Sequence, residues 1–452
     1  MTSSRTLQAI LGTVLSSGLV RTGIGAAATR AIGLILALSM SVFLARVMGA
    51  ERLGHYSLAL AAISLVGIPI QMGLPSLVLR ETARSLAVRD WPLMRGIWLW
   101  ATRRVLLFSG VMAVVAVSAV LVIPTLVQPE ARPVFLVGLP LLPLIALSQV
   151  RSAALRGLGR VVPSQFPDTI LRPGLLMLLT SAAYLATGPQ LSATVVMSIH
   201  VLAASLAFLV GVALLFRFRP KELISEKVRQ VNAKGWRAAV WPLALITGAQ
   251  SVTANADLLM LGWWRDAVEI GHYKVATSAS NVSIIGLSIV AMVCEQRYAV
   301  HFRLGETGRL ARLASGVALI GFVLAVPLIL MLVAFGGVIL RIFFGSGFEQ
   351  GGVALTILVL GQLVNAFCGS SISLLNMSGH ERIAMRGIGL AAVFNVLLNL
   401  LLIPGFGIEG AAAATAVSTI LWNVLLWHGV KTRLGIDCSP LGLFSGRQEE
   451  GK

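Results

Sequence analysis

Residues 104–127 read RVLLFSGVMAVVAVSAVLVIPTLV, and this stretch decides the fold class. Arg104 is its only charged residue, and the apolar residues run on without alternating with polar ones. A run of about 20 apolar residues is long enough to cross about 30 Å of hydrocarbon as an α-helix. Because a helix satisfies its backbone hydrogen bonds internally, the stretch predicts a transmembrane helix.

Comparable apolar runs recur along the whole chain of 452 residues, of which 57% are hydrophobic and 12% charged. Soluble domains carry about 25% charged residues, so this chain has too few to solvate a large surface. The sequence predicts an all-α polytopic membrane protein with about twelve transmembrane helices. Their expected positions are 24–45, 56–79, 104–127, 132–151, 163–187, 191–216, 238–262, 272–296, 313–340, 352–376, 384–404 and 408–430.

The net charge of +18 is interpreted as a signal of orientation, not of nucleic-acid binding. Loops enriched in Lys and Arg stay in the cytoplasm. If both termini are cytoplasmic, the inner loops and termini hold 28 of the 36 Lys and Arg residues, and three more fall inside spans. This distribution predicts a multi-pass protein of the inner (cytoplasmic) membrane with both termini in the cytoplasm. The outer loops then hold only Arg46, Arg52, Arg132, Arg265 and Arg341.

An internal repeat relates the two halves of the chain. Gly54-His55-Tyr56 opens the second predicted span, and Gly271-His272-Tyr273 opens the eighth. Arg80 and Arg297 follow the two tyrosines at the same distance of 24 residues. Six spans separate the copies, which indicates a parallel repeat of two six-helix lobes around a central cavity. The expected domains are an N-terminal lobe (1–216), a basic cytoplasmic linker (217–237), a C-terminal lobe (238–430) and a cytoplasmic tail (431–452).

Ionisable residues inside the predicted spans are the first candidates for a site. Each costs about 2.5–3.5 kcal/mol at mid-membrane and usually faces a cavity. Arg30 lies about 9 Å into the first span, where it either reaches back to the surface or faces the cavity. Asp168 and Arg172 are four residues apart and can neutralise each other. The pair is either structural or functional, and in the second case Asp168 is a candidate for ion coupling. If Arg30 and Arg172 face the cavity, they make an anion site, because arginine matches phosphate oxygens bidentately.

Asp257 and Lys274 lie toward the outer ends of the seventh and eighth spans. They either form a structural ion pair or contribute to the site, where Asp257 would bind a proton or cation that drives transport. Asn365, Asn395 and Asn399 either make interhelical hydrogen bonds or bind sugar hydroxyls. The chain contains no GxxxxGK[ST], no HExxH and no paired Cys/His spacing, so we expect no cofactor, no metal and no enzymatic activity.

Three stretches resemble a known family. The first two are Phe43–Gly49 followed by Leu53–Tyr56, and Asp257–Gly262 followed by Gly271–Tyr273. The third runs from Phe344-Gly345 through Asn395–Asn399 to Ile403–Ala412. In their order and span positions they resemble the polysaccharide-biosynthesis flippases of the Wzx (O-antigen) type. These belong to the superfamily that also contains multidrug and toxin extrusion transporters.

The resemblance implies alternating access and a cargo of undecaprenyl-pyrophosphate-linked oligosaccharide, moved from the cytoplasmic to the periplasmic leaflet. It implies cationic cavity residues, which Arg30, Arg172 and Lys274 match. Membrane lipids and polysaccharide polymerase or assembly proteins are the implied partners. A cation-coupled drug exporter is the main alternative, although it would favour acidic cavity residues. A membrane polymerase or ligase would need a sizeable outer loop, which the prediction lacks.

Overall fold

The computed structural model describes residues 18–445 except 72, 124–127, 189–190 and 226–232. Within this part every regular element is a helix, as predicted. The helices are α2 (Gly18–Val66), α3 (Ile68–Gln71), α4 (Leu74–Val88), α5 (Trp91–Val122), α6 (Ala131–Gly138), α7 (Leu141–Gly157), α8 (Val161–Phe166), the π-helix η2 (Pro167–Leu171), α9 (Arg172–Thr187), α10 (Ala193–Phe218), α11 (Glu222–Ser225), α12 (Ala233–Trp264), α13 (Ala267–Ser280), the 3-10 helix η4 (Asn281–Ile284), α14 (Ile285–Arg303), α15 (Thr307–Phe344), the 3-10 helix η5 (Ser346–Gly351), α16 (Gly352–Cys368), α17 (Ser371–Met377), α18 (Glu381–Leu434) and α19 (Gly442–Ser445).

The number of membrane crossings follows from helix length. Eight described helices are long and apolar enough to span a membrane, or nine with the bent pair α6–α7. Two of them, within α2 and α18, contain non-helical breaks at Gly49 (φ 73) and Gly407 (φ 56). Straight helices of 49 and 54 residues would be about 74 and 81 Å long, more than twice the hydrocarbon thickness, so each makes two crossings. With the more polar α12 included, the described helices are consistent with the prediction of about twelve crossings.

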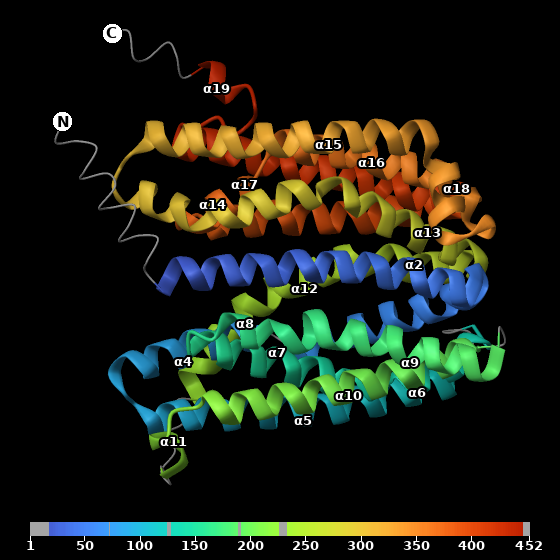
Figure 1. Ribbon diagram of the computed structural model, residues 1–452, viewed down its shortest axis with the longest axis horizontal. Coiled ribbons are helices and arrows are strands. Elements are labelled where there is room, and N and C mark those ends of the chain that lie inside the picture. Colours follow the sequence, from blue (N-terminus) through green and yellow to red (C-terminus); the bar gives the residue numbers. More distant parts are fainter. Residues whose placement is uncertain (1–17, 72, 124–127, 189–190, 226–232, 446–452) are drawn as a thin grey trace.

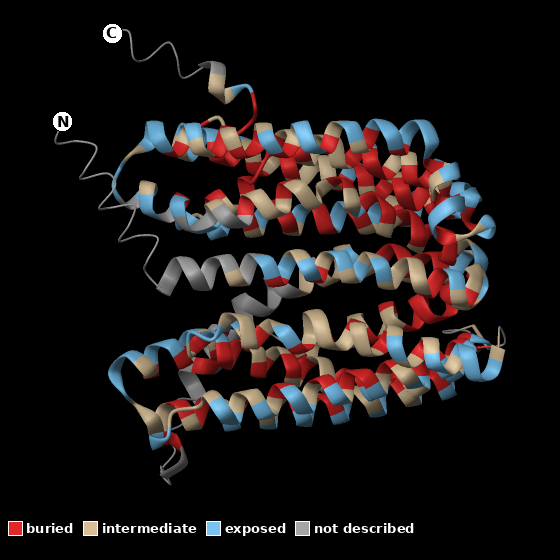
Figure 2. Ribbon diagram, viewed as in Figure 1, coloured by how far each residue is buried: buried red, intermediate tan, exposed pale blue. Residues whose placement is uncertain are grey.

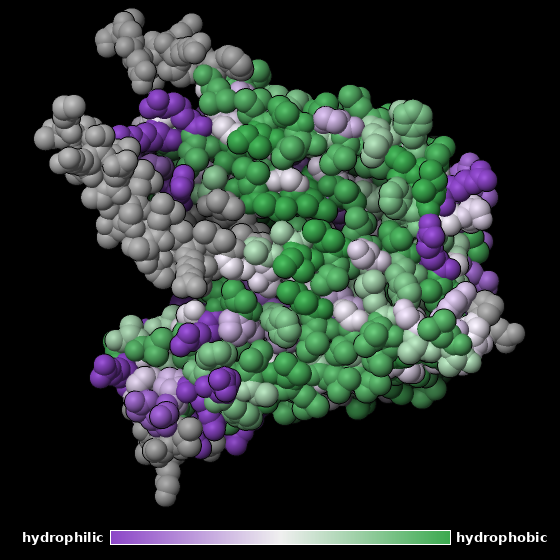
Figure 3. All heavy atoms as spheres, viewed as in Figure 1, coloured by the Kyte–Doolittle hydropathy of each residue, from purple (hydrophilic) through white to green (hydrophobic). Residues whose placement is uncertain are grey.

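The helices form two groups along a common axis (Figure 1). Helices α4 to α10 make the N-terminal lobe and α13 to α18 the C-terminal lobe, while α2 and α12 lie between them. The buried residues lie mainly between helices of a lobe (Figure 2). Apolar side chains cover the middle of the visible face and polar ones gather at the two ends (Figure 3), as expected for a membrane protein. The linker predicted at 217–237 overlaps the end of α10 and the start of α12, and its residues 226–232 lie outside the described part.

One predicted loop was too long. Residues 80–103 were expected to be an inner loop, but α4 continues to Val88 and α5 begins at Trp91. Arg89 (φ 57) makes the tight turn between them, and the Asp90 carboxylate accepts a hydrogen bond from the Leu93 N–H at 3.0 Å. The turn is short because both helices extend as polar helix beyond the apolar run.

The lobes touch at one end of the bundle, the end that carries the Gly49 and Gly407 breaks (hereafter the break end; the other, with the α4–α5 turn, is the basic end). There α2 crosses α13 so closely that a Cβ on Gly54 would lie 1.7 Å from the Ala267 carbonyl oxygen. A Cβ on Gly271 would lie 2.1 Å from the carbonyl oxygen of Ala50. The repeated Ala-x-x-x-Gly-His-Tyr thus packs reciprocally, as expected for two pseudo-symmetric lobes.

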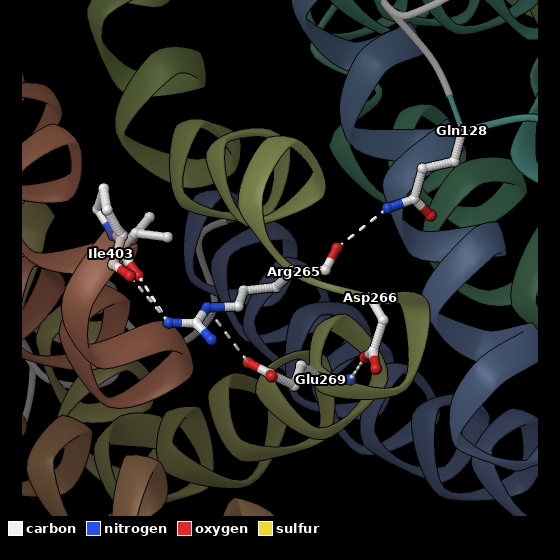
Figure 4. Close-up of polar contacts among 6 residues, drawn as sticks. Gln128, Arg265, Asp266, Glu269 and Ile403 are labelled. Carbon is white, nitrogen blue, oxygen red and sulfur yellow. Dashed lines mark hydrogen bonds and ion pairs between the residues drawn. The ribbon is translucent and has the colours of Figure 1, made fainter.

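A side chain of the N-terminal lobe also reaches across at the break end. The Gln128 amide Nε2 donates hydrogen bonds to the carbonyl oxygens of Gly262 and Arg265 at 3.2 and 3.0 Å. Arg265 in turn donates to the carbonyls of Ile403 and Pro404 at 3.3 and 3.1 Å, so one chain of contacts joins α12 to both neighbours (Figure 4).

Candidate functional site

The N-terminal lobe contains a cavity of about 430 Å³ between α2, η2, α9 and α10. Arg30 and Arg172, predicted from the sequence as an anion site, both line it. Arg30 is exposed and Arg172 half-buried. The other lining residues are Gly33, Leu34, Ala37, Met40, Gln165, Asp168, Thr169, Pro173, Leu176 and His200.

The local backbone explains why these residues meet. Asp168 lies in the π-helix η2, directly before α9 begins at Arg172, and π-turns within helices are frequent at functional sites. The absence of a side chain at Gly33 lets α2 approach η2, since a Cβ there would lie 2.0 Å from Thr169 Cγ2. This contact holds the Arg30 segment of α2 beside the Arg172 end of α9.

The spacing of Asp168 and Arg172 predicted that they would pair, but in the structure they do not. The Asp168 Oδ2 lies 2.5 Å from the Nη2 of Arg151, the last residue of the predicted span 132–151. Arg151 is buried within α7, where 4% of its surface is exposed. Gly211 of α10 makes room for it, because a Cβ on Gly211 would overlap the guanidinium. This pair was not predicted, because an arginine at the end of a span is ordinarily interpreted as part of the adjoining charged loop.

The cavity therefore keeps two positive charges. Asp168 is neutralised by Arg151, and no described residue forms an ion pair with Arg30 or Arg172. On the cavity wall, His200 Nδ1 lies 2.7 Å from the Tyr56 hydroxyl. This hydrogen bond to an uncharged group holds the imidazole ring in place. Unpaired guanidinium groups beside a cavity in a membrane protein make a site for an anion.

The C-terminal lobe contains a buried polar network around Asp257. Its Oδ2 accepts a hydrogen bond from the Tyr273 hydroxyl at 2.5 Å and lies 3.5 Å from the Thr415 hydroxyl. Asn395 Nδ2 donates to Thr415 at 3.4 Å, and Asn399 Nδ2 donates to Asn395 Oδ1 at 3.1 Å. Both asparagines are completely buried, and the side-chain amide oxygen of Asn399, Oδ1, has no partner among the described residues. The network offers a carboxylate with hydroxyl and amide oxygens.

The two networks occupy related places in the repeat. Each repeat tyrosine reaches the last helix of its own lobe: Tyr56 bonds to His200, and Tyr273 lies 3.3 Å from Thr415. Gly54 and Gly271 are 217 residues apart, and the residue 217 positions before Asp257 is Met40, which lines the N-terminal cavity. The charges themselves are not at equivalent positions, since Met40 takes the place of Asp257 in the N-terminal lobe and Gly389 that of Arg172 in the C-terminal lobe.

The remaining predicted residues lie elsewhere. Lys274 is half-buried on α13 and makes no contact ion pair with Asp257, although the two charges interact at longer range. Asn365 is half-buried on α16 and donates to Gln362 Oε1 at 2.9 Å. Neither Lys274 nor Asn365 lines the N-terminal cavity, and neither lines the cavity between the lobes that is described next.

A second cavity, of about 400 Å³, lies between the lobes and was missed by the sequence reasoning. Its polar lining residues are uncharged: Ser64, Gln71, Gln149, Ser251 and Asn255. They come from α2, α3, α7 and α12, which are distant in sequence. Ser251 and Asn255 are four residues apart in a predicted span, a signal that the sequence did carry. We call this the amide cavity.

Comparison with known proteins places this arrangement in a family. A family model described as "polysaccharide biosynthesis protein" matches residues 20–294, more than half of the chain. The chain belongs to this family. A probable low-salt glycan biosynthesis flippase of Haloferax volcanii is 27% identical over 183 residues, which cover 40% of this chain and 38% of that protein.

Solved structures share the fold of this family member. An inward-facing multidrug resistance MATE family transporter of the MOP superfamily aligns with a TM-score of 0.71 and 12% identity, over 89% of this chain and 94% of that one. The lipid II flippase MurJ, in an inward closed conformation, aligns with a TM-score of 0.68 and 12% identity, over 95% and 92%. The predicted two-lobe membrane fold and the family resemblance are therefore confirmed.

Proposed function

We propose that this protein is a flippase for a polyprenyl-pyrophosphate-linked oligosaccharide. The cargo expected from the sequence is an undecaprenyl-pyrophosphate-linked repeat unit of a polysaccharide such as an O-antigen. It would move by alternating access between the lobes from the cytoplasmic to the periplasmic leaflet of the inner membrane. The basic end is then cytoplasmic, in agreement with the charge distribution.

The observation that carries the proposal is the pair of unpaired arginines in the N-terminal cavity. Arg30 and Arg172 line one cavity whose carboxylate, Asp168, is already neutralised by Arg151. A pyrophosphate carries negative charge on two adjacent groups, and two guanidinium groups fit it through bidentate hydrogen bonds. The uncharged amide cavity between the lobes suits the hydroxyls of the attached sugars.

The second part of the proposal concerns energy. Asp257 is 5% exposed and is surrounded by hydroxyl and amide groups instead of a salt bridge. Oxygen ligands of this kind suit a hard cation, and a carboxylate in this position also accepts a proton. We propose that Asp257 binds the coupling proton or cation, with Asn395 and Asn399 as its supporting groups and not as sugar ligands. Lys274 remains a candidate cargo contact on the neighbouring helix.

The test locates the lipid-linked oligosaccharide in cells. In a strain without the protein, and in strains with Arg30→Ala or Arg172→Ala, the intermediate should accumulate in the cytoplasmic leaflet. Arg382→Ala removes an exposed arginine at the start of α18 and serves as the matched control, which should behave like the wild type. If the intermediate still reaches the outer leaflet without the protein, the proposed function is wrong.

A cation-coupled drug exporter is the second candidate, favoured by the buried carboxylate at Asp257 and by the shared fold with a multidrug transporter. It requires an acidic surface for cationic drugs, whereas the N-terminal cavity is cationic. Resistance of cells to cationic dyes distinguishes the two. Loss of the protein should leave dye resistance unchanged if it is a flippase.

A further inference from the structure

The C-terminal lobe contains a third cavity, of about 220 Å³, which the proposed function leaves unassigned. It lies between α12 and the two halves of α18. The lining residues that matter are Thr253 and Ala254 of α12 and Ile388, Ser418, Thr419 and Trp422 of α18. The cavity is separate from the Asp257 network, none of whose side chains line it.

Trp422 lacks a hydrogen-bond partner. Its indole Nε1 is buried and no described residue accepts its hydrogen. By contrast, Trp98 Nε1 donates to Thr82 at 2.9 Å, and Trp427 Nε1 donates to Asp437 at 3.0 Å. A buried donor left unpaired costs about 1–3 kcal/mol, and such groups nearly always find a partner. This atom has almost no accessible surface, so an acceptor oxygen of a ligand in the cavity would supply the missing partner with a small tilt of the indole ring.

The hydroxyl groups around the cavity define the chemistry of that ligand. The Thr253 and Ser418 hydroxyls donate to the carbonyls of Ala249 and Ala414 at 3.0 and 2.7 Å, so their oxygens remain available as acceptors. None of the described residues that line the cavity is charged. A phosphate would lack a cation here and a drug cation would lack a carboxylate, so the ligand is neutral and carries both donors and acceptors.

Size and access narrow the choice further. The volume exceeds that of several waters, at about 30 Å³ each, but falls below the about 300–1,000 Å³ of sites for drug-sized molecules. Ala254 lines both this cavity and the amide cavity between the lobes. The two cavities are therefore neighbours along α12, and only a small side chain is common to their walls.

We propose that this cavity is a sugar subsite, in which the Trp422 indole N–H donates to an oxygen of one sugar ring. The apolar face of the indole, together with Ile388, would cover the C–H face of the ring. This inference rests on the proposed function. The cargo would contact both lobes, its pyrophosphate at Arg30 and Arg172 and its sugar at Trp422, so that movement of the lobes acts on both of its polar parts.

The test compares two probes on the purified, full-length protein in lipid nanodiscs: a polyprenyl pyrophosphate, and the same lipid bearing one hexose. Trp422→Phe keeps the ring and removes the N–H, and should weaken binding of the hexose lipid about fivefold, the effect of one lost hydrogen bond. Binding of the sugar-free lipid should not change. Trp422→Ala should weaken the hexose lipid further, and Arg172→Ala should weaken both lipids.

Trp427→Phe is the matched control, because its indole N–H is bonded to Asp437 away from the cavity, and it should bind both lipids like the wild type. Unchanged binding of the hexose lipid to Trp422→Phe overturns the subsite but leaves the flippase intact. An equal loss for both lipids assigns Trp422 a structural role and also overturns it. If the wild type binds neither lipid, the proposed function fails and the subsite with it.

Discussion

Asp257 and Arg151 show two ways in which the fold holds an ionisable group away from water. Arg151 is paired with a carboxylate and enclosed by Gly211, which is the arrangement of a structural ion pair. Asp257 has only uncharged hydrogen-bond donors, which is the arrangement expected of the cation-binding carboxylate proposed above. The partners of a buried charge, more than its depth, distinguish these roles.

Replacement of Asp257 by Asn tests whether this carboxylate binds the coupling proton or cation. Asp257→Asn keeps the size of the side chain but removes its negative charge, so transport should no longer respond to an imposed proton or sodium gradient. Transport by proteoliposomes under each gradient measures this. Asp266→Asn is the control, because Asp266 caps α13 and Asn caps equally well. A gradient response that survives in Asp257→Asn would rule out this site.

Replacement of Gly211 tests whether Arg151 and Asp168 form a structural ion pair. A side chain at Gly211 would overlap the Arg151 guanidinium, and breaking a buried ion pair costs about 3–5 kcal/mol. Gly211→Leu should therefore lower the Tm of the detergent-solubilised protein by many degrees. Gly174→Ala, on α9 with no atom within 4 Å of the added Cβ, should leave Tm unchanged or raise it slightly. Equal Tm values for Gly211→Leu and the wild type would contradict this packing.

The α2–α13 crossing is the element that joins the lobes at the break end. It is built from a small residue followed four positions later by a glycine, once in each lobe: Ala50 with Gly54, and Ala267 with Gly271. Small residues at this spacing let membrane helices approach closely. Because the contact is reciprocal, a single bulky residue in either helix prevents both halves from closing.

The crossing predicts a shift in conformation. Overpacking costs about 1–3 kcal/mol, so Gly54→Leu should separate the lobes at the break end and favour the alternative, outward-open state about tenfold or more. In a variant lacking Cys294, Cys368 and Cys438, a cysteine at Ala50 should then react faster with an external maleimide. Gly110→Leu, on an open surface of α5, should not change the rate. An unchanged rate in Gly54→Leu would show that the crossing does not form the gate.

Much of the fold was predictable, and the misses have physical causes. Span positions follow from apolar runs, and the two lobes follow from the Gly-His-Tyr repeat, because both patterns can be recognised along the chain without knowing which helices pack together. Arg151 and the amide cavity were missed because they depend on which helices pack together. Gln71 and Gln149, for example, lie on different helices, α3 and α7, and line one cavity only in the folded protein.

The candidate site was only partly predictable for the same reason. Arg30 and Arg172 stood out as cations within apolar spans, and the structure brings them to one cavity. The partner of Asp168 could not be read from helical spacing, because the π-helix changes the direction of its side chain relative to Arg172. Trp422 had no signal at all, since a tryptophan in a span is ordinary until its indole is seen without a partner.

The whole molecule has its lobes joined at the break end, and the amide cavity lies between them. Its two lobes carry groups of opposite charge, cations around Arg172 in the N-terminal lobe and a carboxylate at Asp257 in the C-terminal lobe. Such a pair suits a transporter that binds an anionic cargo in one lobe and a driving cation in the other. The basic end would then be the side from which the cargo enters.

The most direct test measures flipping by the purified protein. Vesicles would contain a polyprenyl-pyrophosphate oligosaccharide with a fluorophore on its sugar, and a membrane-impermeant reductant would quench only the outer leaflet. We expect wild-type vesicles to lose nearly all fluorescence as inner-leaflet lipid is flipped outward, and Arg30→Ala/Arg172→Ala vesicles to retain the inner-leaflet part. If wild-type vesicles quench no further than protein-free ones, or the double variant flips as fast as the wild type, the account is contradicted.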